Sequence, residues 1–242
     1  MSLIQSTSQS PWYATAVTLF PEMFPGPLGY SILGNGLDQD LWRLDTVQIR
    51  DHALDKHATV DDTPYGGGAG MVMKVDVVDR ALETALERQP GRKLIYMSPR
   101  GKPLTQAYAR HLVHDYSGII LLCGRFEGVD QRVIDTKELE EISIGDYILT
   151  GGEIPALVLL DVCARLIPGV IGKQESLVHE SFENGLLEYP QYTRPQSWKN
   201  KIVPEVLLSG DHQRIADWRQ DQAEKITQMR RPDLWQKHIG KK

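Results

Sequence analysis

Hydrophobic positions along the chain follow two spacings, one typical of strands and one typical of helices. Short segments with alternating or continuous apolar residues predict β-strands at 13–20, 44–51, 93–98 and 118–124. Longer segments with apolar residues on one side predict helices at 75–89, 105–116 and 151–169. The run GIILLCG at 118–124 is apolar throughout, which is typical of a strand buried on both faces. Because strands alternate with helices, the pattern predicts an α/β fold with a parallel sheet.

Local signals indicate where several of these elements begin and end. Thr105 is a suitable N-cap for the helix that follows it. Pro99 is expected to stop the strand before it, because proline cannot donate a ladder hydrogen bond. Pro155 lies in the first turn of the last helix, and Pro168 with Gly169 should end that helix.

The pattern changes after Gly172. The segment KQESLVHESFENGLLEYPQYTRP is polar, aperiodic and more than twenty residues long, which favours a functional linker over an idle loop. A helical pattern then returns from 203 to 238, with Asp211 as its N-cap and Pro232 as an interruption. We therefore expect an N-terminal extension, an α/β domain, an interdomain linker and a small all-α domain at 1–11, 12–172, 173–188 and 189–242.

The charge of the chain is distributed unevenly. The net charge is −5, which by itself argues weakly against a nucleic-acid binder. Residues 189–242, however, carry eleven Lys and Arg against six Asp and Glu, a balance of +5 that leaves −10 for residues 1–188. This asymmetry favours an acidic catalytic body with a basic docking module, although a solvated basic helix pair would have the same composition.

Export and membrane signals are lacking in the sequence. The first ten residues, MSLIQSTSQS, have neither the positive charge nor the apolar core of a signal peptide. The longest apolar run, IPALVLL, is too short to span a bilayer. Cys123 and Cys163 lie in apolar runs and predict buried thiols in a reducing compartment, not a disulfide or a zinc site. We expect a cytoplasmic protein.

Three glycine-bearing loops follow apolar strands: YMSPRG at 96–101, CGRFEG at 123–128 and ISIGDYILTGG at 142–152. Ligands of open parallel sheets bind outside the carboxyl ends of the strands, and glycine permits close approach of the backbone. None of the loops matches the dinucleotide fingerprint or the phosphate-binding G-x-x-x-x-G-K-[ST] motif. One such loop would be an ordinary turn, but three favour a ligand held by backbone hydrogen bonds, such as an adenosine moiety.

A fourth glycine-rich segment, YGGGAG at 65–70, does not follow a strand. It is either a phosphate-binding nest or a lid that contacts substrate, and the lid is favoured. His57, Asp61 and Asp62 in the adjacent HATVDD superficially resemble metal ligands. Without cysteines or further histidines nearby, a structural metal site is disfavoured.

Several long motifs together carry a family resemblance: LFPEMF (19–24), DKHATVDDTPYGGGAGM (55–71), CGRFEGVDQR (123–132), ISIGDYILTGGE (142–153), ARLIPGVIGKQES (164–176) and YPQYTRP (189–195). In this order the chain resembles the bacterial tRNA (guanine-37-N1)-methyltransferase family of the SPOUT superfamily, from about Trp12 onward. The resemblance implies a homodimer with its active site at the subunit interface. It also implies a trefoil knot in the carboxyl half of the α/β domain, formed by the three loops, which bind S-adenosylmethionine.

The resemblance further implies which residues bind the cofactor. They are Tyr96, Ser98, Pro99, Gly124, Phe126, Glu127, Ser143, Ile144, Gly145, Asp146, Tyr147, Ile148, Leu149, Gly151, Gly152 and Pro155. Phe126 stands where the family usually has tyrosine, so a contact through that hydroxyl is lost. Asp146 is expected to shape its loop or to orient the substrate instead of acting as an acid or a base.

Methylation of guanine N1 requires removal of its proton, for which a carboxylate is suited, and stabilisation of the charge that develops on O6. The resemblance assigns the second role to Arg165, and the less favoured alternative is a cation that faces the dipole of a helix C-terminus. It places the base at Glu180, where the family has aspartate. His179, Glu183 and Glu188 are the alternatives.

The resemblance also implies substrate contacts and an ion. The residues expected to contact tRNA or to shape its site are His57, Asp61, Gly70 and Arg194. The basic tail should dock the anticodon branch through phosphate contacts that weaken as salt rises. A magnesium requirement is implied as well, with Glu127 and Glu180 as candidate ligands and no ligand cluster in the sequence.

Three other functions remain as alternatives. A knotted methyltransferase could act on ribosomal RNA or on a ribose 2′-oxygen, where no base for N1 is needed. The chain could instead be a non-catalytic RNA-binding or regulatory module. An ATP-dependent enzyme that uses YGGGAG for phosphates is disfavoured, because no Lys-Ser/Thr pair follows the glycines.

Overall fold

The computed structural model describes residues 10–172, 180–182 and 184–240. The chain forms two compact units, residues 1–172 and residues 173–242, and each unit is described by itself. The expected N-terminal extension, residues 1–11, falls mostly on residues 1–9, which lie outside the described residues. The first part of the expected linker, residues 173–179, and residue 183 also lie outside the described residues.

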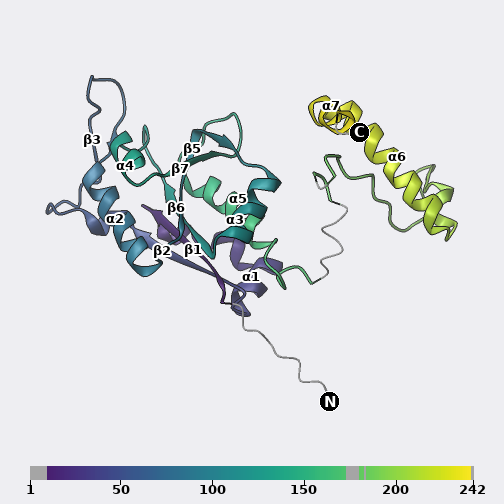
Figure 1. Cartoon of the computed structure of the whole chain (residues 1–242), viewed down its shortest axis with the longest axis horizontal. Helices are drawn as coiled ribbons and strands as arrows, with labels where there is room; N and C mark the ends of the chain where they lie inside the picture. The colour runs from purple at the N-terminus through teal and green to yellow at the C-terminus, as the bar shows by residue number, and fades with distance from the viewer. Residues whose placement is uncertain (1–9, 173–179, 183, 241–242) are drawn as a thin grey trace, which may run out of the picture. The chain divides into compact units, whose positions relative to one another are not determined.

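The first unit is built on a five-stranded sheet (Figure 1). The strand order is β2-β1-β6-β5-β7, and every neighbouring pair is parallel. The strands are β1 (Trp12–Thr18), β2 (Trp42–Gln48), β5 (Lys93–Pro103), β6 (Gly118–Cys123) and β7 (Glu140–Ser143). The parallel sheet predicted from the alternation of strands and helices is thereby confirmed.

Helices cover both faces of this sheet (Figure 1). Residues of α1 (Ser31–Asp38), α3 (Gln106–Asp115) and α5 (Glu153–Ala164) pack into one core, and residues of α2 (Val75–Arg88) and α4 (Gln131–Thr136) pack into the other. The central strand β6 supplies both cores. Ile119 and Leu121 point to the first, whereas Ile120 and Leu122 point to the second. A strand buried on both faces has no polar side, which explains the continuous apolar run.

Two element ends differ from the sequence prediction. Pro99 does not stop β5, because the strand passes an irregularity between Met97 and Lys102 and then pairs with β7 again. Gly101 makes that approach close, since a Cβ on it would lie 2.3 Å from the Ile142 backbone nitrogen. Helix α5 ends at Ala164, well before Pro168, because the following turns close tighter hydrogen bonds of the 3₁₀ type.

Other predicted ends are confirmed. Thr105 caps α3, and its side chain accepts a hydrogen bond from the Tyr108 backbone N–H at 3.2 Å. Short elements link the main ones: η1 (Pro21–Met23), η2 (Gly26–Gly29), η3 (Ile49–His52) and the antiparallel pair β3 (Asp61–Asp62) and β4 (Val72–Met73). The glycine-rich segment 65–70 joins β3 to β4.

The second unit contains α6 (His212–Arg230) and α7 (Pro232–Ile239), preceded by η5 (Glu205–Leu208). Asp211 caps α6 as predicted, and Pro232 starts α7. The helical character is confirmed, and a small antiparallel pair, β8 (Ser197–Trp198) with β9 (Lys201–Ile202), adds to it. In the described part of the chain, no helix has the length and apolar character needed to cross a membrane.

Candidate functional site

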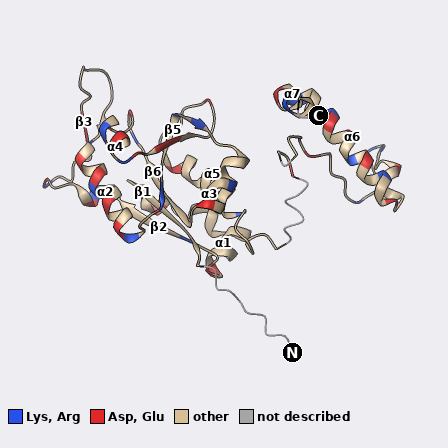
Figure 2. Cartoon of the chain, viewed as in Figure 1, with Lys and Arg blue, Asp and Glu red and all other residues tan. Residues whose placement is uncertain are grey.

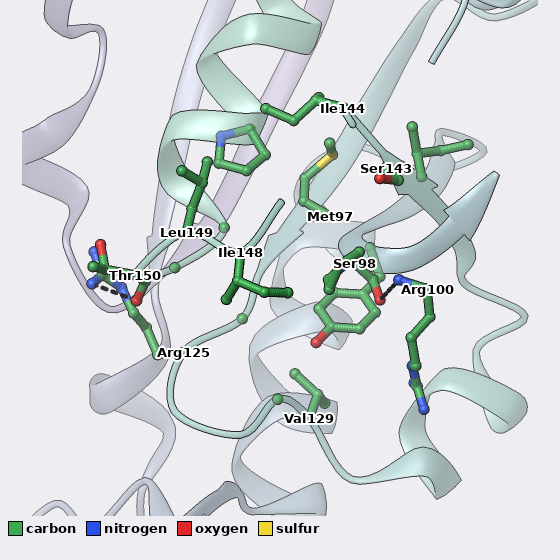
Figure 3. Close-up of a pocket in the computed structure, with 18 of the residues that line it drawn as sticks. Met97, Ser98, Arg100, Arg125, Val129, Ser143, Ile144, Ile148, Leu149 and Thr150 are labelled. Carbon is green, nitrogen blue, oxygen red and sulfur yellow. Dashed lines mark hydrogen bonds between the residues drawn. The ribbon is translucent and has the colours of Figure 1, made fainter. Parts of the chain in front are cut away.

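A cavity of about 360 Å³ lies at the carboxyl ends of β5, β6 and β7. Its walls are the three glycine-bearing loops that follow these strands, together with the start of α5 (Figure 3). This position is the one where open parallel sheets bind ligands, and the volume is in the range of small-molecule sites. The structure therefore brings the three loops singled out in the sequence to one cavity.

The loops approach one another so closely that side chains would not fit between them. A Cβ on Gly152 would lie 2.7 Å from the Cys123 Cα, and one on Gly124 would lie 2.9 Å from the Tyr96 ring. The Gly152 N–H donates to the Gly124 carbonyl at 2.8 Å, which joins the third loop to the second. Glycine thus permits the contact between the loop backbones at Gly152 and the close packing of the Tyr96 ring on Gly124.

The third loop is held by its own hydrogen bonds. Gly145 has a φ of +152° and lies between Ser143, whose hydroxyl donates to the Gly145 carbonyl at 3.1 Å, and Tyr147. The Tyr147 hydroxyl donates back to the Ile144 carbonyl at 3.0 Å. The tip beyond this turn is exposed, with Ile148 at 80%. The base of the loop is therefore held by its own hydrogen bonds, whereas its apolar tip lines the cavity and is exposed to solvent.

Tyr96 forms the buried back wall of the cavity. Its side chain is 5% exposed, and burial raises the pKa of its hydroxyl above the ordinary value. The hydroxyl lies close to Gly124 and Gly128, whose added Cβ atoms would be 2.9 and 3.2 Å away. A buried phenol with a raised pKa stays protonated at neutral pH, so Tyr96 shapes the site and does not serve as its base.

All of the cofactor residues expected from the resemblance line this cavity, apart from Asp146. Asp146 is exposed and lies outside the lining. Sequence reasoning missed further lining residues: Met97, Arg100, Arg125, Gly128, Val129, Ile142 and Thr150. The sequence could have indicated these residues by their position, because each lies within or next to one of the three loop motifs.

The segment at 65–70 meets the cavity through Glu127. The Glu127 N–H donates to the Met71 carbonyl at 2.9 Å, and a Cβ on Gly70 would lie 2.5 Å from the Glu127 side chain. His57 and Asp61 do not line the cavity. The His57 N–H donates to the Asp55 carboxylate at 2.9 Å within a turn, and Asp61 pairs with Met73 in the β3–β4 ladder.

The two expected catalytic residues belong to different units. Arg165 follows the last residue of α5 in the first unit, and its side chain is partly buried. Glu180 is a partly buried residue of the second unit. Of the alternatives to Glu180, Glu188 is described and partly buried, whereas His179 and Glu183 lie outside the described residues.

The chain segment after Glu180 packs on α6 within the second unit. Leu186 is buried at 6%, and the Leu187 N–H donates to the Thr227 hydroxyl at 2.8 Å. Thr227 itself is fully buried, and its hydroxyl donates to the Ala223 carbonyl at 2.7 Å. One side chain of α6 thus ties down the segment that carries Glu180.

A second cavity, of about 500 Å³, lies within the second unit. Arg194 lines it, and its aromatic walls include Tyr192 and Trp218, whose ring centroids lie 6.2 Å apart. The Arg219 guanidinium lies 4.9 Å from the centroid of the Tyr189 ring. Flat rings beside guanidinium groups are suited to contact with nucleobases and phosphates.

The two cysteines are buried, as the apolar runs around them predict. Cys123 and Cys163 are buried free cysteines, and burial raises the pKa of both thiols, that of Cys163 to about 12. Among residues 10–172, 180–182 and 184–240, no group of three or more His, Cys, Asp or Glu side chains could hold a metal ion.

A parallel sheet with a glycine-walled cavity at its carboxyl edge defines the chain as an α/β protein with a small-molecule site. Comparison with known families is more specific: the model of the family described as tRNA (Guanine-1)-methyltransferase TrmD matches residues 13–237. The chain belongs to this family. The predicted family and its methyltransferase class are thereby confirmed.

Curated relatives are similar over nearly their whole length. The tRNA (guanine-N(1)-)-methyltransferase of Novosphingobium aromaticivorans is 60% identical over 94% of this chain and 92% of its own. The proteins of the same name from Nitrobacter winogradskyi and Brucella ovis are 58% and 60% identical, each over 93% of this chain. The matched regions cover 93% of the Nitrobacter protein and 92% of the Brucella protein.

Proposed function

We propose that the protein transfers a methyl group from S-adenosylmethionine to N1 of guanosine 37 in tRNA. Membership of the methyltransferase family supports the reaction, and the glycine-walled cavity is the structural observation that carries the proposal. The cavity fits this cofactor because glycines leave the backbone accessible beside apolar side chains such as Ile148 and Leu149, which suits an adenosine moiety. Ser98, Gly124 and Gly152 would contribute to holding it.

When bound, the cofactor supplies an electrophilic methyl group. The work left for the protein is to orient guanine and to manage its charge. Glu180 takes the N1 proton as general base, a role that contributes about 10²–10⁴-fold. Arg165 stabilises the negative charge that develops on O6. A partly buried carboxylate and a partly buried guanidinium suit these roles, since exclusion of water strengthens both interactions.

The proposal is tested by methyl transfer to tRNA transcripts that differ only at guanosine 37 and at its 5′ neighbour. The expected product is 1-methylguanosine at position 37, identified by mass analysis of the nucleosides, and no product from a transcript with adenosine at 37. Methylation of a ribose 2′-oxygen or of ribosomal RNA would favour the other knotted methyltransferases. Titration calorimetry with S-adenosylmethionine that shows no binding would favour a non-catalytic RNA-binding module.

The second unit is proposed to dock the anticodon branch of the tRNA. Arg194 and Arg219 line its aromatic cavity, and basic residues exceed acidic ones in 189–242. Basic positions lie among acidic ones along α6 (Figure 2), so the contacts should be local and not those of a uniformly basic surface. His57, Asp61 and Gly70 of the first unit complete the proposed tRNA-contacting set.

Oligomeric state, domain bounds and chain topology are also proposed. We propose a homodimer with its active site at the subunit interface, supported by α5, which is apolar yet leaves Ile154 48% and Val158 38% exposed. Light scattering on the purified protein tests it. The domain bounds 12–172, 173–188 and 189–242 and the trefoil knot also remain proposals. They are supported by the division at Gly172 and by the contact between the second and third loops.

Cytoplasmic location and magnesium are the last two proposals. The free buried cysteines support a reducing compartment. For magnesium, the described residues of one chain do not supply a full ligand set, so no step of the reaction is assigned to the ion. Glu127 and Glu180 stay candidate ligands, and methylation assays with and without a chelator test the requirement.

A further inference from the structure

A charged side chain lies beneath the junction of the second and third loops. Arg125 of the second loop donates from Nη1 to the Thr150 carbonyl of the third loop at 3.2 Å (Figure 3). Its Nε lies 2.9 Å from Oε2 of Glu153, the first residue of α5. The side chains are 19% and 1% exposed. The contact is one between charges, since the N–H is not aligned for a hydrogen bond.

The buried carboxylate is held from its other side by the sheet. The Thr18 hydroxyl, at the end of β1, donates to Oε1 of Glu153 at 2.8 Å. It also accepts a hydrogen bond from the Phe20 N–H at 3.0 Å. A buried charge without partners is strongly unfavourable, so Glu153 in this position depends on both Arg125 and Thr18. Thr18 thus meets, at one carboxylate, two residues that lie 107 and 135 positions further along the chain.

The Arg125 guanidinium has little freedom to move. It lies 4.3 Å from the centroid of the Phe20 ring, and its Nη2 is 3.7 Å from the Met23 sulfur. A Cβ on Gly151 would lie 2.3 Å from Arg125 Nε. Gly151 does not have a left-handed backbone, so the side chain of Arg125 is what requires glycine there.

We propose that Arg125, Glu153 and Thr18 are positioning residues that set the spacing of the second and third loops for cofactor binding. Thr18 and Glu153 do not line the cavity, so they act through Arg125 and the backbone at 150–152. The inference rests on the proposed function, because it concerns binding of S-adenosylmethionine to the glycine-walled cavity. It adds residues that the cofactor itself need not contact.

Thr18 offers a matched pair of variants for the test. Thr18→Val keeps the shape but leaves Glu153 without its hydroxyl partner, whereas Thr18→Ser keeps the hydroxyl. We expect Thr18→Val to weaken binding of S-adenosylmethionine in titration calorimetry by about tenfold, as for one buried group left unsatisfied. The KM for the cofactor should rise with it, the KM for tRNA should not change, and Thr18→Ser should bind within about threefold of the parent protein.

A double-mutant cycle tests the link between Arg125 and Gly151. Gly151→Ala should weaken cofactor binding in the parent protein, and should weaken it much less when Arg125→Ala has removed the obstructing side chain. Equal effects in both backgrounds would overturn the proposal, as would wild-type cofactor affinity in folded Thr18→Val. A parallel rise in the KM for tRNA, or a Thr18→Ser protein as weak as Thr18→Val, would show a general structural role and also overturn it. If the parent protein does not bind S-adenosylmethionine, the proposed function itself is wrong.

Discussion

The hydrogen bond between Leu187 and Thr227 predicts that one α6 side chain limits local opening of the segment that carries Glu180. The change to make is Thr227→Val, which preserves shape and burial but removes the hydroxyl. In the native protein this hydroxyl accepts from the Leu187 N–H at 2.8 Å and donates to the Ala223 carbonyl at 2.7 Å. The helical Ala223 carbonyl has an intrahelical partner of its own, so the Leu187 N–H is the group that loses its acceptor.

A buried donor left without an acceptor costs about 1–3 kcal/mol. At about 1.36 kcal/mol for each factor of ten, this corresponds to local opening that is about 5- to 150-fold more frequent. We therefore expect the Leu187 amide to exchange its hydrogen faster by that factor in Thr227→Val. The amides of the parallel sheet, such as that of Leu121, should exchange at the parent rate.

Hydrogen–deuterium exchange followed by mass spectrometry or NMR measures this effect on the full chain. Thr227→Ser is the control, because it keeps the hydroxyl and loses only a methyl group. We expect its Leu187 amide to stay protected. If Thr227→Val leaves the exchange of Leu187 unchanged, the hydroxyl does not hold this segment and the reasoning is refuted. Faster exchange throughout the second unit in both variants would point to lost packing instead.

The remaining predictions concern the reaction, tRNA binding and a buried thiol. Glu180→Gln should keep cofactor affinity yet slow single-turnover methylation by at least about tenfold, whereas Glu188→Gln, at an alternative base, should methylate at the parent rate. The reverse pattern would place the base at Glu188, and a parent rate in both variants would place it elsewhere. Lys201 is expected to contact a tRNA phosphate. Lys201→Ala should therefore make the plot of log affinity for tRNA against log salt, measured by filter binding, less steep by about one. An unchanged slope would exclude that contact. Because burial raises the pKa of the Cys163 thiol to about 12, this thiol should stay protonated and unreactive towards a thiol-specific reagent at pH 8, and react once the chain is unfolded. Rapid labelling of native Cys163 would contradict its burial.

The fold was predictable from sequence where the signal is local. The apolar run at 118–124 becomes the central strand, and Thr105 and Asp211 cap helices because capping depends on residues within one turn. The continuation of β5 past Pro99 was not predictable in this way. It depends on β7, which offers a second stretch of partners after the irregularity.

The candidate site was predictable in its motifs but not in its supports. Glycine loops after apolar strands indicated the cavity, because parallel strands end at one edge of the sheet. Nothing local indicated that Thr18 would meet Glu153, since 135 positions separate them and threonine in a strand is unremarkable. The placement of Asp146 also needed the structure, because alternation at a loop tip does not say which side chain faces inward.

Several glycines line the cavity, so part of its wall is main chain, and this has a consequence for inhibitors. A side chain that recognises a ligand can be replaced by mutation, but a backbone N–H or carbonyl is present whichever residue carries it. Substitution at Gly124 or Gly152 would add a Cβ within 3 Å of neighbouring atoms, which damages the site for any occupant. A competitor that reads the same backbone groups as the natural ligand therefore leaves the protein few routes to resistance that preserve its own activity.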